Sequence, residues 1–133
     1  MTRPAWADEG KRLYRTARWL NLRKQILLRD GYVCQVSGVL LRGGRSDRTA
    51  TVLRPAVIDH LMPHMGDEQL FFEPDNLWAI SADVHDTVCQ AIERRRGISP
   101  EAVRAAKVAY RHIGIDGYPC KPQGRWVDSR WPL

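Results

Sequence analysis

The chain has 133 residues and a mass of 15.3 kDa, which suits one domain with a modest hydrophobic core. Its net charge is +6, its sequence pI is about 9.7, and 17 of its 21 basic residues are arginine. Arginine binds phosphate oxygens through two parallel hydrogen bonds, so this bias favours a polyanionic partner. Arginine-rich chains also come from GC-rich genomes, so composition alone does not decide the partner. No apolar run is long enough for a membrane span, and we expect a cytoplasmic protein.

The first half of the chain predicts one helix after a polar arm. Residues 1–12 are expected to form an N-terminal extended arm. Apolar residues then recur at helical spacing over 13–30, basic residues fill the other faces, and Gly31 supplies a stop. A tight turn over 32–38 leads into a short strand at 39–41 and a polar loop at 42–48.

The second half predicts two strands followed by two helices. The β-branched run 50–59 indicates a strand, and Pro55 within it favours an edge or bulged position. Ser81 is a candidate N-cap of a helix that Gly97 closes, and Ser99 of a second helix that ends near His112. The remaining expected segments are a long loop over 61–74, a return strand over 77–80 and a tail over 113–133.

Four polar residues at a characteristic spacing are the candidate catalytic and metal-binding residues. The strand run ends in Asp59-His60, Asn76 follows 16 residues after His60 in a turn-forming string, and His85 follows 9 residues after Asn76 near the start of a helix. This spacing resembles the His-Asn-His motif of phage-type HNH endonucleases. The resemblance implies an α+β fold with a ββα-metal (His-Me finger) core and flanking N-terminal and C-terminal helices. It implies a nuclease domain over 13–112, with the 113–133 tail packed on it.

Phosphodiester hydrolysis needs an activated water and a cation for the scissile phosphate. Neighbouring strand residues point to opposite sides, so we expect Asp59 and His60 to differ in role. Asp59 and His85 are assigned to one divalent metal ion (Mg, Mn, Ni or Zn), and His60 is assigned as the general base. The resemblance gives Asn76 the role of tying the loop and orienting His60, whereas an isolated Asn in a turn is usually a turn former.

Further residues are candidates for substrate binding. His64 belongs to a Pro-His-x-Gly-Asp string that matches the family pattern. Three roles are open for His64: contact with the phosphate, support of the metal ligands, or stabilisation of the long loop. Arg45 and Arg48 lie in a basic loop ahead of the strand, and Arg95 lies at a helix end where cations are favourable in their own right. Cys89 shares a helical face with His85, where some relatives carry another metal-binding His, but a small core residue is the favoured interpretation.

The cysteines depart from the family pattern. Many phage-type relatives bind a structural zinc through two Cys-x-x-Cys pairs, which here read Cys34-Gln-Val-Ser37 and Ser81-Ala-Asp-Val84. Serine and valine cannot replace thiolates at a tetrahedral zinc, so no structural zinc is expected. Packing must then hold together the two turns that carry these four-residue strings, which we call the knuckles. The three cysteines are odd in number and far apart, which argues against a disulfide framework.

The sequence therefore predicts a divalent-metal-dependent HNH endonuclease that hydrolyses DNA. The resemblance implies a phage or prophage origin and phage packaging proteins as partners. The alternative is a non-catalytic DNA-binding or packaging accessory protein on a degenerate HNH scaffold. A homing or restriction enzyme is a third possibility, disfavoured because the short chain has no separate recognition module.

Overall fold

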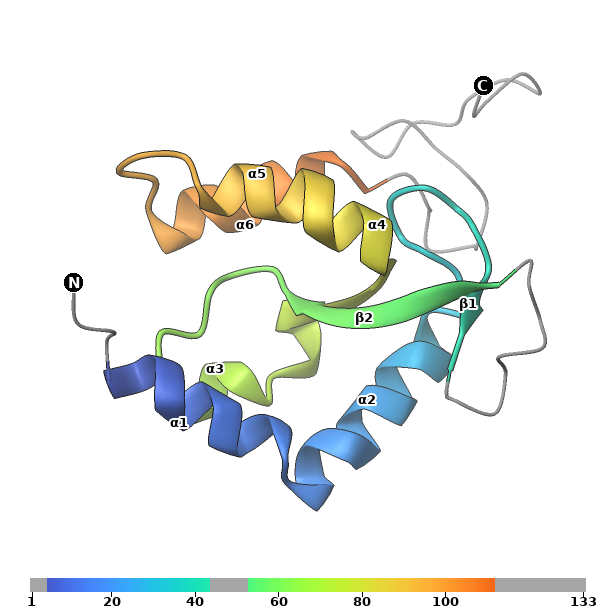
Figure 1. Ribbon diagram of the computed structural model, residues 1–133, viewed down its shortest axis with the longest axis horizontal. Coiled ribbons are helices and arrows are strands. Elements are labelled where there is room, and N and C mark those ends of the chain that lie inside the picture. Colours follow the sequence, from blue (N-terminus) through green and yellow to red (C-terminus); the bar gives the residue numbers. More distant parts are fainter. Residues whose placement is uncertain (1–4, 44–52, 112–133) are drawn as a thin grey trace.

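The computed structural model describes residues 5–43 and 53–111, in which two layers of helices enclose a small sheet (Figure 1). On one side of strand β2 lie α1, α2 and α3, and on the other lie α4, α5 and α6. The α+β class predicted from the sequence is confirmed. In chain order the elements are α1 Ala5–Tyr14, α2 Ala17–Arg29, β1 Leu41–Arg42, β2 Arg54–His60, α3 Glu68–Phe71, η2 Pro74–Asn76, β3 Leu77–Ser81, α4 Ala82–Val84, η3 His85–Cys89, α5 Gln90–Glu93 and α6 Pro100–Ala109.

The N-terminal segment is a helix from Ala5, so the extended arm expected over residues 1–12 is wrong in its described part. Leu13 is buried in the core and anchors this helix. The single helix expected over 13–30 is instead two helices, because Thr16 acts as a cap: its hydroxyl accepts from the Trp19 N–H at 3.1 Å and donates to the Leu13 carbonyl at 2.7 Å. Satisfying these terminal backbone groups ends α1 and starts α2 in a new direction.

The sheet has the order β1-β2-β3. Strands β2 and β3 are antiparallel, with Asp59 opposite Trp78 and His60 opposite Leu77. Strand β1 is parallel to β2 and pairs with Arg54 and Pro55, whereas pairing with β3 begins at Ala56. The edge position expected from Pro55 is therefore wrong. The strand is central, and Pro55 is the last residue paired with β1, one position before pairing with β3 begins.

Short polar side chains set the helix starts as predicted. The Ser81 hydroxyl accepts from the Val84 N–H at 3.2 Å, and the Ser99 hydroxyl accepts from the Ala102 N–H at 3.1 Å. Gly97 follows the first of these helices with a φ of +73°. The helix after Ser81 is not uniform, because η3 is a π-helical segment between α4 and α5.

The core lies between α2 and β3, and every residue of β3 is buried. Polar side chains also connect these elements. Arg29 donates through Nη2 to the Leu77 carbonyl at 2.6 Å, and Asp30 accepts through Oδ2 from the Ala79 N–H at 2.8 Å. These bonds fix the strand that carries Trp78 beneath Asp59. Within the described ranges, every helix is too short or too polar to cross a bilayer.

Candidate active site

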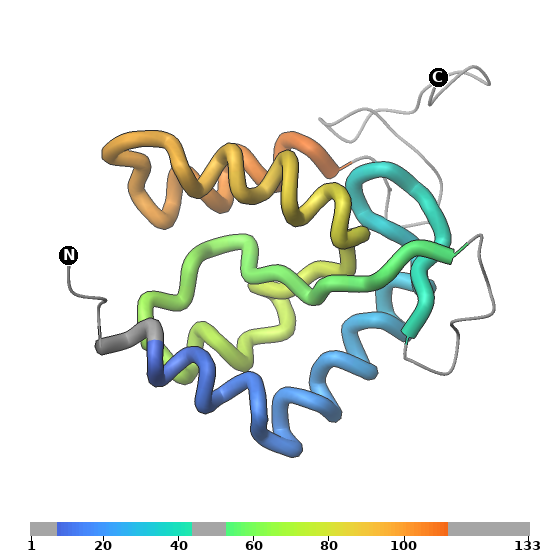
Figure 2. Tube along the Cα trace, viewed as in Figure 1, coloured from blue at the N-terminus to red at the C-terminus, as the bar shows by residue number. Residues whose placement is uncertain are grey.

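A cleft of about 480 Å³ opens at the C-terminal end of β2. It brings together four residues singled out from the sequence, namely Asp59, His60, His64 and His85. Figure 2 shows how: after β2 the chain runs toward α1 before it returns as β3, so α1 lies beside the loop that follows His60. The other lining residues are Tyr14, Pro63, Met65, Glu93, Ile98, Pro100 and Val103.

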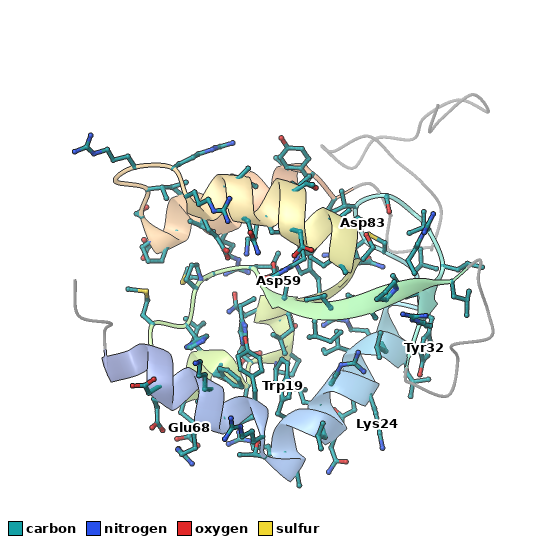
Figure 3. The ribbon with its side chains drawn as sticks, viewed as in Figure 1. Trp19, Lys24, Tyr32, Asp59, Glu68 and Asp83 are labelled. Atoms are coloured by element: carbon teal, nitrogen blue, oxygen red, sulfur yellow. The ribbon has the colours of Figure 1, made fainter. Side chains whose placement is uncertain are left out.

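Asp59 faces the helical layer that carries His85. Its Oδ1 lies 3.8 Å from His85 Nε2. Its Oδ2 accepts from Trp78 Nε1 at 3.0 Å and from Lys107 Nζ at 2.8 Å. Figure 3 shows Asp59 between β2 and the helices above it. The two bonds to Oδ2 fix the carboxylate so that Oδ1 is directed at the imidazole.

The span between Asp59 Oδ1 and His85 Nε2 fits a shared metal ion. Metal–oxygen and metal–nitrogen bonds to Zn are about 2.0–2.2 Å, so two ligand atoms on one ion can be separated by up to about 4 Å. The observed 3.8 Å is within that limit. In residues 5–43 and 53–111, however, no three His, Cys, Asp or Glu side chains are grouped to hold an ion. A metal held by Asp59 and His85 would take its other ligands from water or substrate.

His60 lies on the opposite side of the strand and is held as a neutral imidazole. Its Nε2 lies 3.0 Å from the Phe71 carbonyl, which can only accept, so Nε2 carries the proton. Trp19 stacks on the ring with an interplanar angle of 18°. Burial lowers the pKa of His60 to about 4. At neutral pH Nδ1 therefore has a lone pair and can accept a proton.

Tyr14 is a site residue that the sequence did not reveal. Its hydroxyl oxygen lies 3.4 Å from His60 Nδ1. Tyr14 is 42% exposed as a whole, but it lines the cleft, where desolvation of the hydroxyl, followed by the charges of Asp59 and Glu93, raises the pKa of Tyr14 to about 12. The hydroxyl therefore stays protonated and donates to Nδ1. The residue comes from α1, close to the segment expected as an arm, and no motif in the sequence points to it.

Asn76 closes the loop that follows His60. Its Oδ1 accepts from the Met62 N–H and its Nδ2 donates to the Met62 carbonyl, both at 2.9 Å. The Asn76 carbonyl accepts from the Leu61 N–H at 2.8 Å. The amide thus pairs with the backbone in both directions, which a carboxylate cannot do. The tie expected from Asn76 is present, and it fixes the chain directly after the imidazole.

His64 belongs to the tight turn of that same loop. Its Nδ1 accepts from the Gly66 N–H at 3.0 Å, and its ring lies 5.0 Å from the His60 ring. Burial lowers its pKa. A Cβ added to Gly10 would lie 2.9 Å from His64 Cε1, so a glycine is needed where α1 crosses the loop. These contacts match the alternative in which His64 stabilises the loop. Because the ring also lines the cleft, contact between His64 and the phosphate stays a hypothesis.

Lys107 of α6 is the second residue that the sequence analysis missed. It is 0% exposed, and its ammonium donates to Asp59 Oδ2, to Glu93 Oε1 and to the His60 carbonyl at 2.7–2.8 Å. Burial alone would lower its pKa, but the carboxylates of Asp59 and Glu93 outweigh burial and raise it. One sequence signal was available. Lys107 lies four residues after Val103, on the buried face of its helix.

Cys89 lies beneath the site and is fully buried. Burial is the main cause that raises the pKa of this thiol. A protonated, buried thiol is a poor metal ligand. The interpretation of Cys89 as a small core residue therefore agrees with its surroundings.

The arginines divide into structural and exposed residues. Arg23 donates to the carbonyls of Gly43 and Ala56, and Arg29 donates to those of Pro74 and Leu77. Part of the positive charge is therefore already committed to backbone carbonyls. Arg95 is exposed just beyond the end of α5. Arg45 and Arg48 lie outside the described residues.

The four knuckle positions come together around one thiol. Cys34 Sγ accepts from the N–H groups of Ser37 and Ser81 at 3.4 and 3.3 Å, and its thiol lies 3.9 Å from the Ser81 hydroxyl. That hydroxyl also accepts from the Val84 N–H. Hydrogen bonds thus join the two turns at this point. The absence of a structural zinc stays a prediction.

Comparisons of the chain with protein-family models, with curated proteins and with solved structures find no match.

Proposed function

We propose that the chain is a divalent-metal-dependent endonuclease that hydrolyses DNA phosphodiester bonds on a ββα-metal core of the HNH type. The observation that carries the proposal is the arrangement in one cleft of the Asp59–His85 pair and a neutral His60. In this assignment β2, β3 and the helix that starts at Ala82 supply the three elements of the core. The net charge of +6 supports a polyanionic substrate.

The reaction follows from the hydrogen bonds of His60. Phe71 fixes the proton on Nε2, so Nδ1 is the basic nitrogen. Once the Tyr14 hydroxyl turns its proton away from Nδ1, Nδ1 takes a proton from a water molecule, and the resulting hydroxide attacks phosphorus as the P–O3′ bond breaks. Asp59 Oδ1 and His85 Nε2 would hold the ion, which when bound stabilises charge on the phosphate and on the departing oxygen. The Tyr14 hydroxyl, beside Nδ1, is placed to orient the water.

A second candidate is the non-catalytic DNA-binding protein. The observations that favour it are the low exposure of His60, at 6%, and the contact of Tyr14 with the nitrogen that must act as base. In this case DNA would bind without being cut. The two candidates differ in one measurable property, namely metal-dependent cleavage.

The deciding experiment is plasmid cleavage with Mg, Mn, Ni, Co and Zn, with an EDTA control. Cleavage should require metal, and His60→Ala should lower the rate by about 10²-fold or more while leaving metal affinity nearly intact, because a general base contributes on that scale. Asp59→Asn and His85→Ala should weaken metal binding itself. Asp83→Asn is the matched control, because this exposed carboxylate lies in the same helical layer as His85.

Two results would contradict the proposal. One is cleavage that EDTA does not reduce. The other is DNA binding with no cleavage in any of the metals, which would support the second candidate. Equal loss of metal affinity in the His60, Asp59 and His85 variants would refute the division of roles.

A further inference from the structure

The ammonium of Lys107 fills a closed shell of oxygen atoms. Its three hydrogens match three acceptors, at 2.8 Å from Asp59 Oδ2, 2.7 Å from Glu93 Oε1 and 2.7 Å from the His60 carbonyl. The side chain is 0% exposed. No donor is left for a substrate, so Lys107 does not contact DNA from this position.

Two carboxylate oxygens and one backbone carbonyl around a point are the ligand type that hard divalent cations prefer. The position of Lys107 Nζ is therefore a cation position that the chain fills with its own charge. A purely structural explanation accounts for it less well, because replacing a buried ion pair with packed apolar side chains is often neutral or stabilising.

The same carboxylate serves two neighbours. Asp59 Oδ2 is bound by Lys107, while Asp59 Oδ1 faces His85 Nε2 at 3.8 Å. Asp59 thus lies between the ammonium and the metal position assigned above. While Lys107 is present, Asp59 can offer a metal one oxygen, and Glu93 is held away from that metal by its own bond to the ammonium.

We propose that Lys107 is a positioning residue that permanently occupies the second cation position of this centre and so restricts the centre to a single divalent ion. The inference rests on the proposed function for the identity of the first position. The ammonium holds Asp59 in monodentate geometry, weakens metal binding through its charge, and excludes a second ion from the oxygen shell. It acts through Asp59 and touches neither the metal nor the scissile phosphate.

The test is Mn²⁺ binding to the DNA-free protein, followed by calorimetry and by electron paramagnetic resonance. Wild-type protein should bind one equivalent. Lys107→Ala removes the stem as well as the charge, so it opens the shell to an ion with water ligands and should bind two equivalents. Lys107→Gln keeps most of the volume and two hydrogen-bond donors but removes the charge. It should still bind one equivalent, roughly tenfold or more tightly, because a unit charge a few ångströms away is removed.

Lys24→Ala is the matched control. Lys24 is an exposed lysine on α2, in the opposite helical layer from α6 (Figure 3), so its removal changes the net charge equally without touching the shell. It should leave both the stoichiometry and the affinity unchanged. Circular dichroism establishes that each variant is folded, and the Gln variant keeps the test decisive if the Ala variant unfolds.

The outcomes separate this inference from the proposed function. If wild-type protein binds one equivalent, the inference is overturned when Lys107→Ala leaves the stoichiometry unchanged or Lys107→Gln leaves the affinity unchanged. The proposed function would still stand in that case. No Mn²⁺ in wild type would count against the proposed function. Lys107→Ala alone would then decide the inference, since the opened shell should still gain one ion.

Discussion

Replacing His60 with glutamine should change how the stability of the protein depends on pH. The imidazole is 6% exposed and donates through Nε2 to the Phe71 carbonyl, a bond that a glutamine amide can replace. Burial lowers its pKa from 6.5 to about 4 in the folded protein. A histidine with a depressed pKa binds protons more readily when unfolded, so it stabilises the fold less as the pH falls.

The magnitude follows from the width of that pH interval. A shift of one pKa unit corresponds to about 1.4 kcal/mol, so lowering the pKa from 6.5 to about 4 implies a loss of about 3 kcal/mol as the pH falls through this interval. Above pH 6.5 the contribution is fully present, and below the folded pKa there is no further loss. Total stabilities of single domains are about 5–15 kcal/mol, so the effect is readily measurable.

The assay is urea denaturation of wild type and His60→Gln at matched pH values between about 7.5 and 4, with EDTA present so that metal binding does not contribute. Other titrating groups are common to both proteins and cancel in the difference. Over this range the free energy of unfolding of wild type should fall by about 3 kcal/mol more than that of the variant. Parallel curves would refute the description of His60 as a buried, neutral base.

Two further predictions concern the loop and the knuckles. Asn76→Ala should lower the free energy of unfolding by about 2 kcal/mol, because the N–H and carbonyl of Met62 lose their partners. Asn76→Asp should lose at least as much, because it buries a carboxylate against the Met62 carbonyl at a position that is only 2% exposed. A change below about 0.5 kcal/mol for the Ala variant would contradict the tie. Purified protein should contain no stoichiometric zinc, and EDTA should not alter its thermal unfolding measured by circular dichroism, since the Cys34 sulfur accepts from Ser37 and Ser81. Zinc that survives dialysis would show that the knuckle assignment is wrong.

Local signals in the sequence located the starts of the helices that follow Ser81 and Ser99, and both long strands. Ser81 and Ser99 cap helices as expected, because capping depends on the residue itself and on the three that follow. The spacing of Asp59, His60, Asn76 and His85 predicted side chains that the structure brings to a single loop and cleft. That success follows from the order strand, loop, strand, helix, which fixes their relative positions over a short stretch of chain.

The parts that were missed depend on contacts between distant segments. Tyr14 lies 46 residues from His60, and Lys107 lies 48 residues from Asp59. Neither pairing has a local pattern, because each depends on how a whole helix packs against the sheet. The first helix was also missed. Its polar composition suggested an arm, and only the packing of residues such as Leu13 makes a helix favourable there.

The π-helical segment η3, His85–Cys89, sets the rotational phase of the helix that crosses the site. An α-helix turns by about 100° per residue, so in a regular helix His85 and Glu93, eight positions apart, would be offset by about 80° around the axis. A π-type turn rotates by only about 80° per residue, and over η3 this removes most of the offset. Both side chains are thereby aligned toward the end of β2. The length of this segment is consequently more constrained than its composition: exposed positions such as Thr87 can vary, whereas deleting one residue would rotate His85 and Glu93 out of line with each other.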